Sequence, residues 1–261
     1  MNNHLLKCYR MAYEQCFVPI FVHDDFDTET LLRGCELAGV QVVEYTLRRP
    51  DAAEVIPALR RRWPECGLFV GSMLDSDKIT IQMRKKYPQL MTFAELDEIG
   101  VDGFVSMLSF TNETIRTYAE RCIMIPTAST PGEALRQVDA GAHFIKLKGS
   151  DRELRKNCHA APTHGFCPIF VTGGVTPERM SEIYAEGAII TASGFDLILK
   201  GIDPQALTAE MVAERLTLYI NAAKAARAEV LPQLADTQNL TDDAWLDLLP
   251  HYHSLKEEAY V

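Results

Sequence analysis

Two lysines on one face of a single predicted strand are the residues of this sequence best suited to chemistry. Residues 143–148 are His-Phe-Ile-Lys-Leu-Lys, and strand alternation puts Phe144, Lys146 and Lys148 on one face. Burying an unpaired ammonium group is costly. The segment is therefore either an edge or frayed strand with both lysines in solvent, or a site where one lysine acts as a nucleophile. Burial or a neighbouring cation would lower the pKa of that lysine, and the free amine could then form a Schiff base with a ketone.

A carboxylate and a guanidinium group stand near the end of another apolar run. Glu44 interrupts the run at 42–45, so an inward carboxylate would be available there for acid–base work or for pairing with a lysine. Arg48, four residues further on, has the two-pronged guanidinium group that suits a substrate carboxylate. Taken alone, Glu44 is equally compatible with a structural ion pair.

Two loops in the last third of the chain have sequences that suit an anion. Residues 171–177 contain Gly173 and Gly174 just before a predicted helix, and Thr-Ala-Ser-Gly at 191–194 follows the last apolar run. Backbone N–H groups in such loops can face a phosphate at the start of a helix. A glycine pair is also common in plain tight turns. Because the two loops occur in successive units, we expect phosphate binding.

Alternating strands and helices must position these residues. Apolar runs rich in β-formers predict eight strands, and segments with helical spacing lie between most of them. Such alternation implies parallel strands with right-handed crossovers, and eight strands favour a closed barrel, whose active site lies at the carboxyl ends of the strands. The predicted strands are 17–22, 40–45, 68–72, 103–105, 122–125, 143–147, 168–171 and 188–191, and the helices between them are 28–38, 51–62, 111–120, 130–140 and 176–186.

The 261 residues exceed a single barrel in three places. We expect an N-terminal leader at 1–16, a (β/α)8 TIM barrel at 17–227 and a C-terminal helical tail at 228–261. Residues 75–100 are interpreted as an insertion, and a long amphipathic helix at 208–229 precedes the tail. The tail is expected to dock on the barrel or on a neighbouring subunit, with a lid over the substrate as the alternative.

Composition narrows the class of protein. The chain is 47% hydrophobic and 24% charged with a net charge of −10, which excludes disordered and low-complexity classes. It has no block of Lys and Arg of the kind that nucleic-acid binding requires. Seven cysteines without a C-x-x-C pair favour a reducing compartment, and no apolar stretch reaches the roughly 18 residues of a membrane span. We expect a cytoplasmic protein that acts on small molecules, without nucleic-acid or membrane partners.

The histidines predict no metal site. His159 and His164 are close in sequence, but no carboxylate lies at ligand spacing from them. His23, at the end of the first predicted strand, could touch substrate, although a hydrogen-bonded structural histidine is the more frequent case.

Three motifs, taken in order, resemble the 2-keto-3-deoxy-6-phosphogluconate and 4-hydroxy-2-oxoglutarate aldolases. They are Glu-x-Thr-Leu-Arg at 44–48, Phe-Ile-Lys-Leu at 144–147 and Thr-Gly-Gly-Val at 172–175, and the likeness extends over about residues 18–226. The resemblance implies a class I lyase on a (β/α)8 barrel, in which a trimer is usual. Such an enzyme reversibly cleaves a 2-keto-4-hydroxy acid, phosphorylated or not, into pyruvate and an aldehyde. It needs no metal or cofactor because the iminium is the electron sink.

The resemblance also implies roles for single residues. Lys146 would form the Schiff base, Glu44 would move protons through a water, and Arg48 would hold the carboxylate of pyruvate. Thr172 would contact the same pyruvyl end, and Ser72 stands where the family usually has a threonine. The residues that match phosphate-binding positions are Gly173, Gly174 and Ser193.

Three loops around the expected pocket depart from the family pattern. The lysine strand usually continues as Lys-x-Phe-Pro-Ala, whereas Lys148-Gly149-Ser150 stands here. Met107-Leu108 follows Ser106 in place of Pro-Gly, and Thr127 replaces the glycine of a Pro-Gly turn. We therefore expect retained imine chemistry with an altered substrate. Lys148 would either lower the pKa of Lys146 or bind an extra anionic group of the substrate.

Two other functions remain open at this point. One is a phosphate-binding barrel of different activity, such as a sugar-phosphate epimerase or a thiamin-phosphate synthase-like transferase, which would not use Lys146 covalently. The other is a catalytically idle relative that binds a sugar acid or scaffolds an assembly. The altered loops favour this last hypothesis, and the intact set of Glu44, Arg48 and Lys146 opposes it.

Overall fold

Eight parallel strands form the centre of the computed structural model, which describes residues 3–159 and 165–251. The strands are β1 (Phe17–Phe21), β2 (Val42–Thr46), β3 (Gly67–Met73), β4 (Gly103–Ser106), β5 (Ile123–Ile125), β6 (Ile145–Lys148), β7 (Ile169–Thr172) and β8 (Ala188–Gly194). Their order in the sheet is β5-β4-β3-β2-β1-β8-β7-β6, and a parallel bridge between Thr127 and Lys146 joins its two edges. The expected (β/α)8 TIM barrel is confirmed.

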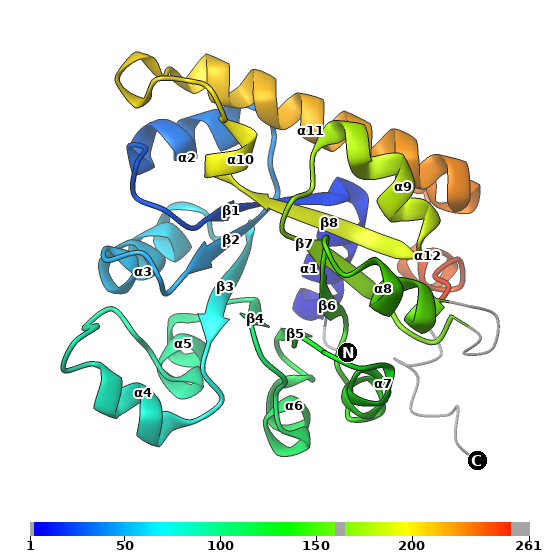
Figure 1. Cartoon of the computed structure of the whole chain (residues 1–261), viewed down its shortest axis with the longest axis horizontal. Helices are drawn as coiled ribbons and strands as arrows, with labels where there is room; N and C mark the ends of the chain where they lie inside the picture. Colours follow the sequence, from blue (N-terminus) through cyan, green and yellow to red (C-terminus); the bar gives the residue numbers. More distant parts are fainter. Residues whose placement is uncertain (1–2, 160–164, 252–261) are drawn as a thin grey trace.

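Helices follow the strands and cover the outside of the barrel (Figure 1). Several begin at a Ser, Thr or Asp whose side chain accepts a hydrogen bond from the first turn, as helix starts require. The helices are α2 (Thr28–Leu37), α3 (Ala52–Arg62), α5 (Phe93–Ile99), α6 (Asn112–Tyr118), α7 (Pro131–Asp139), α8 (Arg152–His159), the turn η2 (Pro177–Arg179) with α9 (Met180–Ala185), α10 (Phe195–Ile198), the turn η3 (Pro204–Ala206) and α11 (Ala209–Val230).

Strand alternation divides the apolar side chains into two layers. One cluster fills the barrel and includes Val42, Phe144, Phe170 and Ala192. The other lies between strands and helices and includes Val43, Tyr45, Ile145, Leu147 and Val171. Since residues two apart on a strand share a face, Glu44, Lys146, Lys148, Thr172 and Gly194 have the parity of the interior layer.

The N-terminal leader is a helix, α1 (Asn3–Gln15), that closes the base of the barrel. Its buried side chains Leu5, Tyr9, Ala12 and Tyr13 pack in the same cluster as the interior side chains of the strands. The Gln15 side chain then donates to the carbonyls of Phe17 and Val42, at the amino ends of β1 and β2. Together these contacts place α1 at the end of the barrel opposite the carboxyl ends of the strands.

The C-terminal tail docks on α1. Its short elements are η4 (Pro232–Leu234) and α12 (Asp242–Leu246). The Trp245 ring packs edge-on against Tyr13 at 5.5 Å between centroids, and Arg10 donates to Asp242 at 2.8 Å and to the Thr237 carbonyl at 2.8 Å. As far as residue 251, the tail therefore lies at the base and is not a lid over the mouth.

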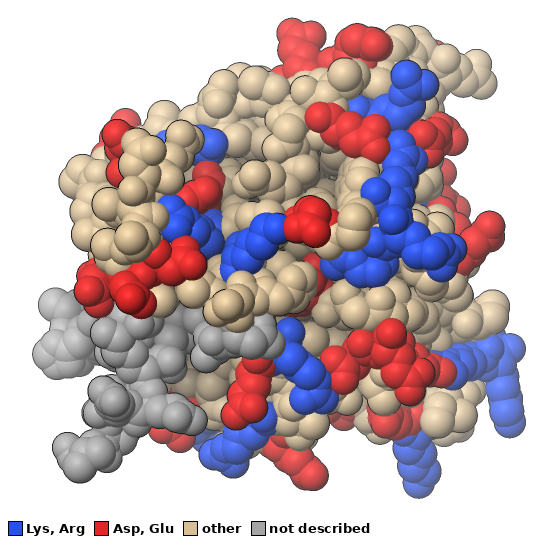
Figure 2. All heavy atoms as spheres, turned by 180° about the vertical axis from the view of Figure 1, so that it is seen from behind, with Lys and Arg blue, Asp and Glu red and all other residues tan. Residues whose placement is uncertain are grey.

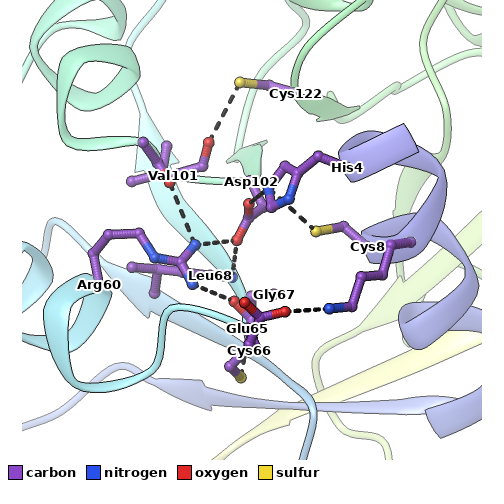
Figure 3. A network of polar contacts seen from close by, with 12 residues as sticks. His4, Cys8, Arg60, Glu65, Cys66, Gly67, Leu68, Val101, Asp102 and Cys122 are labelled. Carbon is purple, nitrogen blue, oxygen red and sulfur yellow. Dashed lines mark hydrogen bonds and ion pairs between the residues drawn. The ribbon is translucent and has the colours of Figure 1, made fainter. Parts of the chain in front are cut away.

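A buried carboxylate fastens α1 to the barrel (Figure 3). Asp102, just before β4, is 1% exposed at its side chain. Its Oδ2 accepts hydrogen bonds from Arg60 Nη1 at 2.5 Å and from the Leu68 amide at 2.7 Å, and its Oδ1 lies 2.6 Å from His4 Nε2. One side chain thus joins α1, α3, β3 and β4.

The insertion after β3 is shorter than expected. The second helical pattern of residues 75–100 is α5, a regular barrel helix, whose Phe93 and Leu96 pack in the outer cluster with Phe104 of β4. The additional segment is α4 (Asp77–Met83) and the loop after it. Arg84 ties it to α5 through a hydrogen bond to Glu95 at 2.8 Å.

Three global expectations can be compared with the described residues. None of their helices is long and apolar enough to cross a membrane. All seven cysteines are free. On the face seen in Figure 2, acidic side chains lie beside the basic ones.

Candidate active site

A pocket of about 310 Å³ opens at the carboxyl ends of the strands. Strand parity and the following loops bring together most of the side chains to which the sequence pointed. The predicted residues that line it are Glu44, Arg48, Lys146, Lys148, Thr172, Gly173, Gly174 and Ser193. Ser72 is not among the lining residues. A larger cavity of about 640 Å³ lies at the base beside α1 and α11, away from all of these groups.

Lys146 is a buried amine at the floor of the pocket. It is 5% exposed, and burial lowers its pKa below the ordinary value of 10.5; Arg48 and Lys148 lower it further, whereas Glu44 opposes the shift. Its Nζ lies 4.0 Å from the sulfur of Met107, a weak acceptor. A lowered pKa increases the fraction of free amine near neutral pH, which is the form that attacks a ketone.

Glu44 brings a buried carboxyl group to the same pocket. It is 1% exposed, and burial raises its pKa, against the opposite effect of Lys146 and Arg48. Its Oε2 has no hydrogen-bond partner within the described part of the chain. Because buried polar atoms are nearly always paired, the unused oxygen points to a place for a water or a substrate group. A carboxyl group with a raised pKa suits general acid–base catalysis.

Arg48 is held at the mouth by Ser72. Arg48 Nε donates to Ser72 Oγ at 3.0 Å, which is the only hydrogen bond of the Arg48 side chain to the described residues. Ser72 has φ +65°, the left-handed region that residues other than glycine seldom adopt. This backbone conformation coincides with a register shift between β3 and β4. The geometry therefore gives Ser72 a positioning role toward Arg48.

The glycine loop after β7 requires glycine at both of its Gly positions. Gly173 and Gly174 have φ +84° and +68°, conformations that favour glycine. Ser193, on β8, is 1% exposed and donates its hydroxyl to the Val175 carbonyl at 2.7 Å. The serine is thus next to the pocket, but its only proton donor is used inside the fold.

Eight lining residues were not assigned to the site from the sequence: the apolar Ile20, Val22 and Leu197, together with His23, Met107, Thr127, Gly194 and Asp196. Met107 and Thr127 appeared only as departures from the family pattern, His23 as a residue that could touch substrate but is more often structural, and Asp196 not at all. Thr127 faces inward and donates to the Ser106 carbonyl at 2.6 Å. The Asp196 carboxylate lies over Gly194, because a Cβ at residue 194 would collide with Asp196 Oδ1.

Potential metal ligands gather elsewhere. Within residues 3–159 and 165–251, the only group of three side chains with closely spaced ligand atoms is His4, Cys8 and Asp102, at the base of the barrel. There Asp102 is already bonded to Arg60 and to a backbone amide. His159 belongs to no such group, and His164 lies outside the described residues.

The fold and the pocket define a (β/α)8 barrel whose mouth holds a buried lysine of lowered pKa beside a carboxyl group and an arginine. No protein-family model matches the chain. It is 24% identical over 188 residues to a KHG/KDPG aldolase of Escherichia coli K12, covering 69% of this chain and 80% of that protein. It is 21% identical over 214 residues to a 2-dehydro-3-deoxy-phosphogluconate aldolase of Zymomonas mobilis, covering 80% and 94%.

A solved structure described as native KDPGal has the same fold. It superposes with a TM-score of 0.61 at 20% sequence identity, over 80% of this chain and 95% of that one. The similarity to the KHG and KDPG aldolases, which are carbon–carbon lyases, is therefore confirmed in sequence and in fold, and it favours the aldolase expectation over the two alternatives.

Proposed function

We propose that this protein is a class I aldolase that reversibly cleaves a 2-keto-4-hydroxy acid into pyruvate and an aldehyde through a Schiff base on Lys146. The observation that carries the proposal is the pairing of a buried amine of lowered pKa with a buried carboxyl group, Glu44, that has an unused oxygen in the same pocket. An epimerase or an idle relative has no need of this costly pair.

The geometry supports a role for each group in the reaction. Arg48 at the mouth binds the carboxylate of the keto acid, so that C2 faces Lys146. The free amine of Lys146 attacks C2, and loss of water from the carbinolamine gives the iminium ion. Glu44, directly or through a water, takes the proton of the C4 hydroxyl group. The C3–C4 bond then breaks, its electron pair moves to the iminium, and the aldehyde leaves.

The second half of the cycle returns the proton. In this proposal Glu44 is the acid that protonates the enamine at C3. The product of this step is the iminium of pyruvate. Water hydrolyses it and frees Lys146. In this proposal Thr172 contacts the pyruvyl group, which is supported by its position in the pocket lining and its register with Lys148 on the neighbouring strand.

Borohydride trapping tests this proposal. The protein is incubated with pyruvate, reduced, digested and mapped by mass spectrometry, with Lys146→Ala as the loss variant and Lys148→Met as its neighbour control. We expect an adduct on Lys146, absent from Lys146→Ala. An adduct on Lys148 would overturn the assignment of the nucleophile, and no adduct at any pH would overturn the aldolase proposal.

We further propose that the protein is a homotrimer of the cytoplasm. The family resemblance supports a homotrimer, and exposed apolar side chains such as Ile79, Ile81 and Leu108 are available for subunit contacts. Light scattering of the purified chain measures this state. The seven free cysteines support a reducing compartment and hence the cytoplasm.

A further inference from the structure

Asp196 introduces a negative charge where the sequence predicted a phosphate site. It lines the pocket together with Gly173, Gly174, Ser193 and Gly194, the residues of the two predicted anion loops. Gly194 has interior parity on β8, two residues after Ala192, so the direction of its missing side chain is toward the mouth. Asp196 Oδ1 lies where a side chain of residue 194 would begin, so the carboxylate is inside the mouth of the barrel.

Two side chains near these loops that could bind a phosphate are engaged elsewhere. The hydroxyl of Ser193 donates to the Val175 carbonyl. Arg179, below the glycine loop, donates to the carbonyls of Gly174 at 2.7 Å and Gly149 at 3.1 Å and does not line the pocket. Both bonds hold its guanidinium group against the backbone of the loops.

The cations that do line the pocket stand on other strands. Arg48 and Lys146 belong to the pyruvyl end of the proposed reaction, which leaves Lys148 on β6 as the one further Lys or Arg among the described lining residues. A phosphate monoester carries nearly two negative charges at neutral pH. In the β7 and β8 loops it would meet the Asp196 carboxylate, and Lys148, in register with Thr172 on the strand beside β7, is the one cation left to offset that charge.

We propose that Asp196 excludes phosphorylated substrates and instead accepts hydrogen bonds from the hydroxyl groups of an uncharged substrate chain. The inference rests on the proposed aldolase function and specifies its substrate class: 2-keto-4-hydroxy acids whose far end carries free hydroxyl groups. An ionised carboxylate has only acceptor sites, so hydroxyl donors complement it and phosphate oxygens do not. Specificity of this kind depends on a repulsive element against the wrong ligand as well as on attraction of the right one.

A paired-substrate experiment tests the inference. Condensation of pyruvate with D-glyceraldehyde is compared with condensation with D-glyceraldehyde 3-phosphate, in the wild type, in Asp196→Asn and in Asp25→Asn. The readout is the ratio of the two kcat/KM values, so a general loss of activity in a variant cancels. Asp25 is an exposed carboxylate in the loop after β1 that does not line the pocket, and its variant controls for a general change in charge.

We expect the wild type to favour the unphosphorylated aldehyde by about tenfold or more, and Asp196→Asn to shift the ratio toward the phosphorylated aldehyde by a similar factor, mainly through KM. Asp25→Asn should leave the ratio unchanged. A wild type that prefers the phosphorylated aldehyde, or an Asp196→Asn variant with an unaltered ratio, would overturn the inference.

Binding of inorganic phosphate gives a readout that does not depend on turnover. Calorimetric titration should show weaker binding to the wild type than to Asp196→Asn, and equal affinities would also contradict the inference. Failure of the proposed function has a different signature. In that case the wild type forms no borohydride-trapped pyruvate adduct, whatever its affinity for phosphate.

Discussion

The carboxylate of Glu44 occupies space that Gly71 leaves open on the neighbouring strand. A Cβ at residue 71 would collide with Glu44 Oε1 and would lie 3.0 Å from Cγ2 of Thr46. Both residues are buried in the paired strands β2 and β3. Interior packing leaves few voids of this size. The absence of a side chain at 71 is therefore what allows a carboxyl group to stand in the interior layer.

We expect Gly71→Ala to displace the Glu44 carboxylate and to lower kcat by about 10- to 100-fold, a large part of the usual contribution of a general acid–base group. The adduct on Lys146 should still form with pyruvate, because the amine is untouched. Steady-state kinetics and borohydride trapping measure the two effects. Gly132→Ala, in α7, where a new Cβ would lie 3.6 Å from the flexible end of Arg136, is the matched control and should keep full activity. Unchanged kcat in Gly71→Ala would remove Glu44 from its proposed role.

We expect Glu44→Gln to lower the activity and to raise the stability of the fold. Loss of the titrating group lowers kcat by about 10²- to 10⁴-fold. Burial raises the pKa of Glu44 in the folded protein, so its contribution to stability is present below pH 4.5 and is lost as the pH rises through the folded pKa. A glutamine cannot ionise, so the variant avoids this loss of stability. At pH values above the pKa of Glu44 in the folded protein, its free energy of unfolding should be higher than that of the wild type by about 1–2 kcal/mol, and in acid the two should be equal. Urea unfolding at acidic and alkaline pH measures the difference. An equal effect at both would contradict it.

The pH profile of adduct formation reports on Lys146 directly. Because its pKa is lowered, the rate of trapping with pyruvate should rise with pH and level off below pH 10.5. Lys148 is one of the causes of that lowering, so Lys148→Met should move the profile toward higher pH, with activity recovering there. If Lys148 instead binds an anionic group of the substrate, the profile keeps its position and the KM of the acceptor aldehyde increases.

Arg48→Lys tests recognition of the keto-acid carboxylate. A lysine retains the charge but lacks the planar fork and the Nε that donates to Ser72. We expect KM for pyruvate to increase by about 10-fold or more while the pH profile of trapping changes little. Ser72→Ala should give a smaller change in the same direction, because Arg48 remains but is less well positioned. A change in kcat alone would argue against carboxylate binding.

Asp102→Asn should weaken the fold without touching the pocket. The change removes a charge-assisted partner of Arg60 at a position that is 1% exposed, and we expect a loss of about 2–4 kcal/mol in the free energy of unfolding. The exposed pair of Lys7 and Glu65 provides the control, since Glu65→Gln should leave the free energy of unfolding nearly unchanged. Urea denaturation measures both. Comparable losses would show that the buried network holds α1 no better than a surface ion pair.

The barrel and the pocket floor could be predicted from the sequence because both follow from periodicity. Alternation alone put Lys146 on the face of Phe144, and all eight strands form where apolar runs predicted them. The role of the leader was missed, although Leu5, Cys8, Tyr9, Ala12 and Tyr13 have helical spacing. That pattern does not show that the helix packs under a barrel.

Periodicity of the sequence could not identify Asp196 as a residue of the pocket. It lies on α10, a helix of four residues that is too short for a periodic pattern, and its position over Gly194 depends on how the chain turns after β8. The extent of the insertion was overestimated for a related reason. The pattern at 93–99 is helical, but only packing against Phe104 shows that the helix belongs to the barrel.

The closed base has a kinetic consequence. Since α1 fills the end of the barrel beneath the interior layer, the opening toward Lys146 among the described residues is the mouth, past Arg48 and Lys148. The keto acid bound at the floor must then enter before the aldehyde and leave after it. Condensation should accordingly follow a compulsory order, with pyruvate as the first substrate, and in cleavage pyruvate should be the product that competes with the incoming sugar acid.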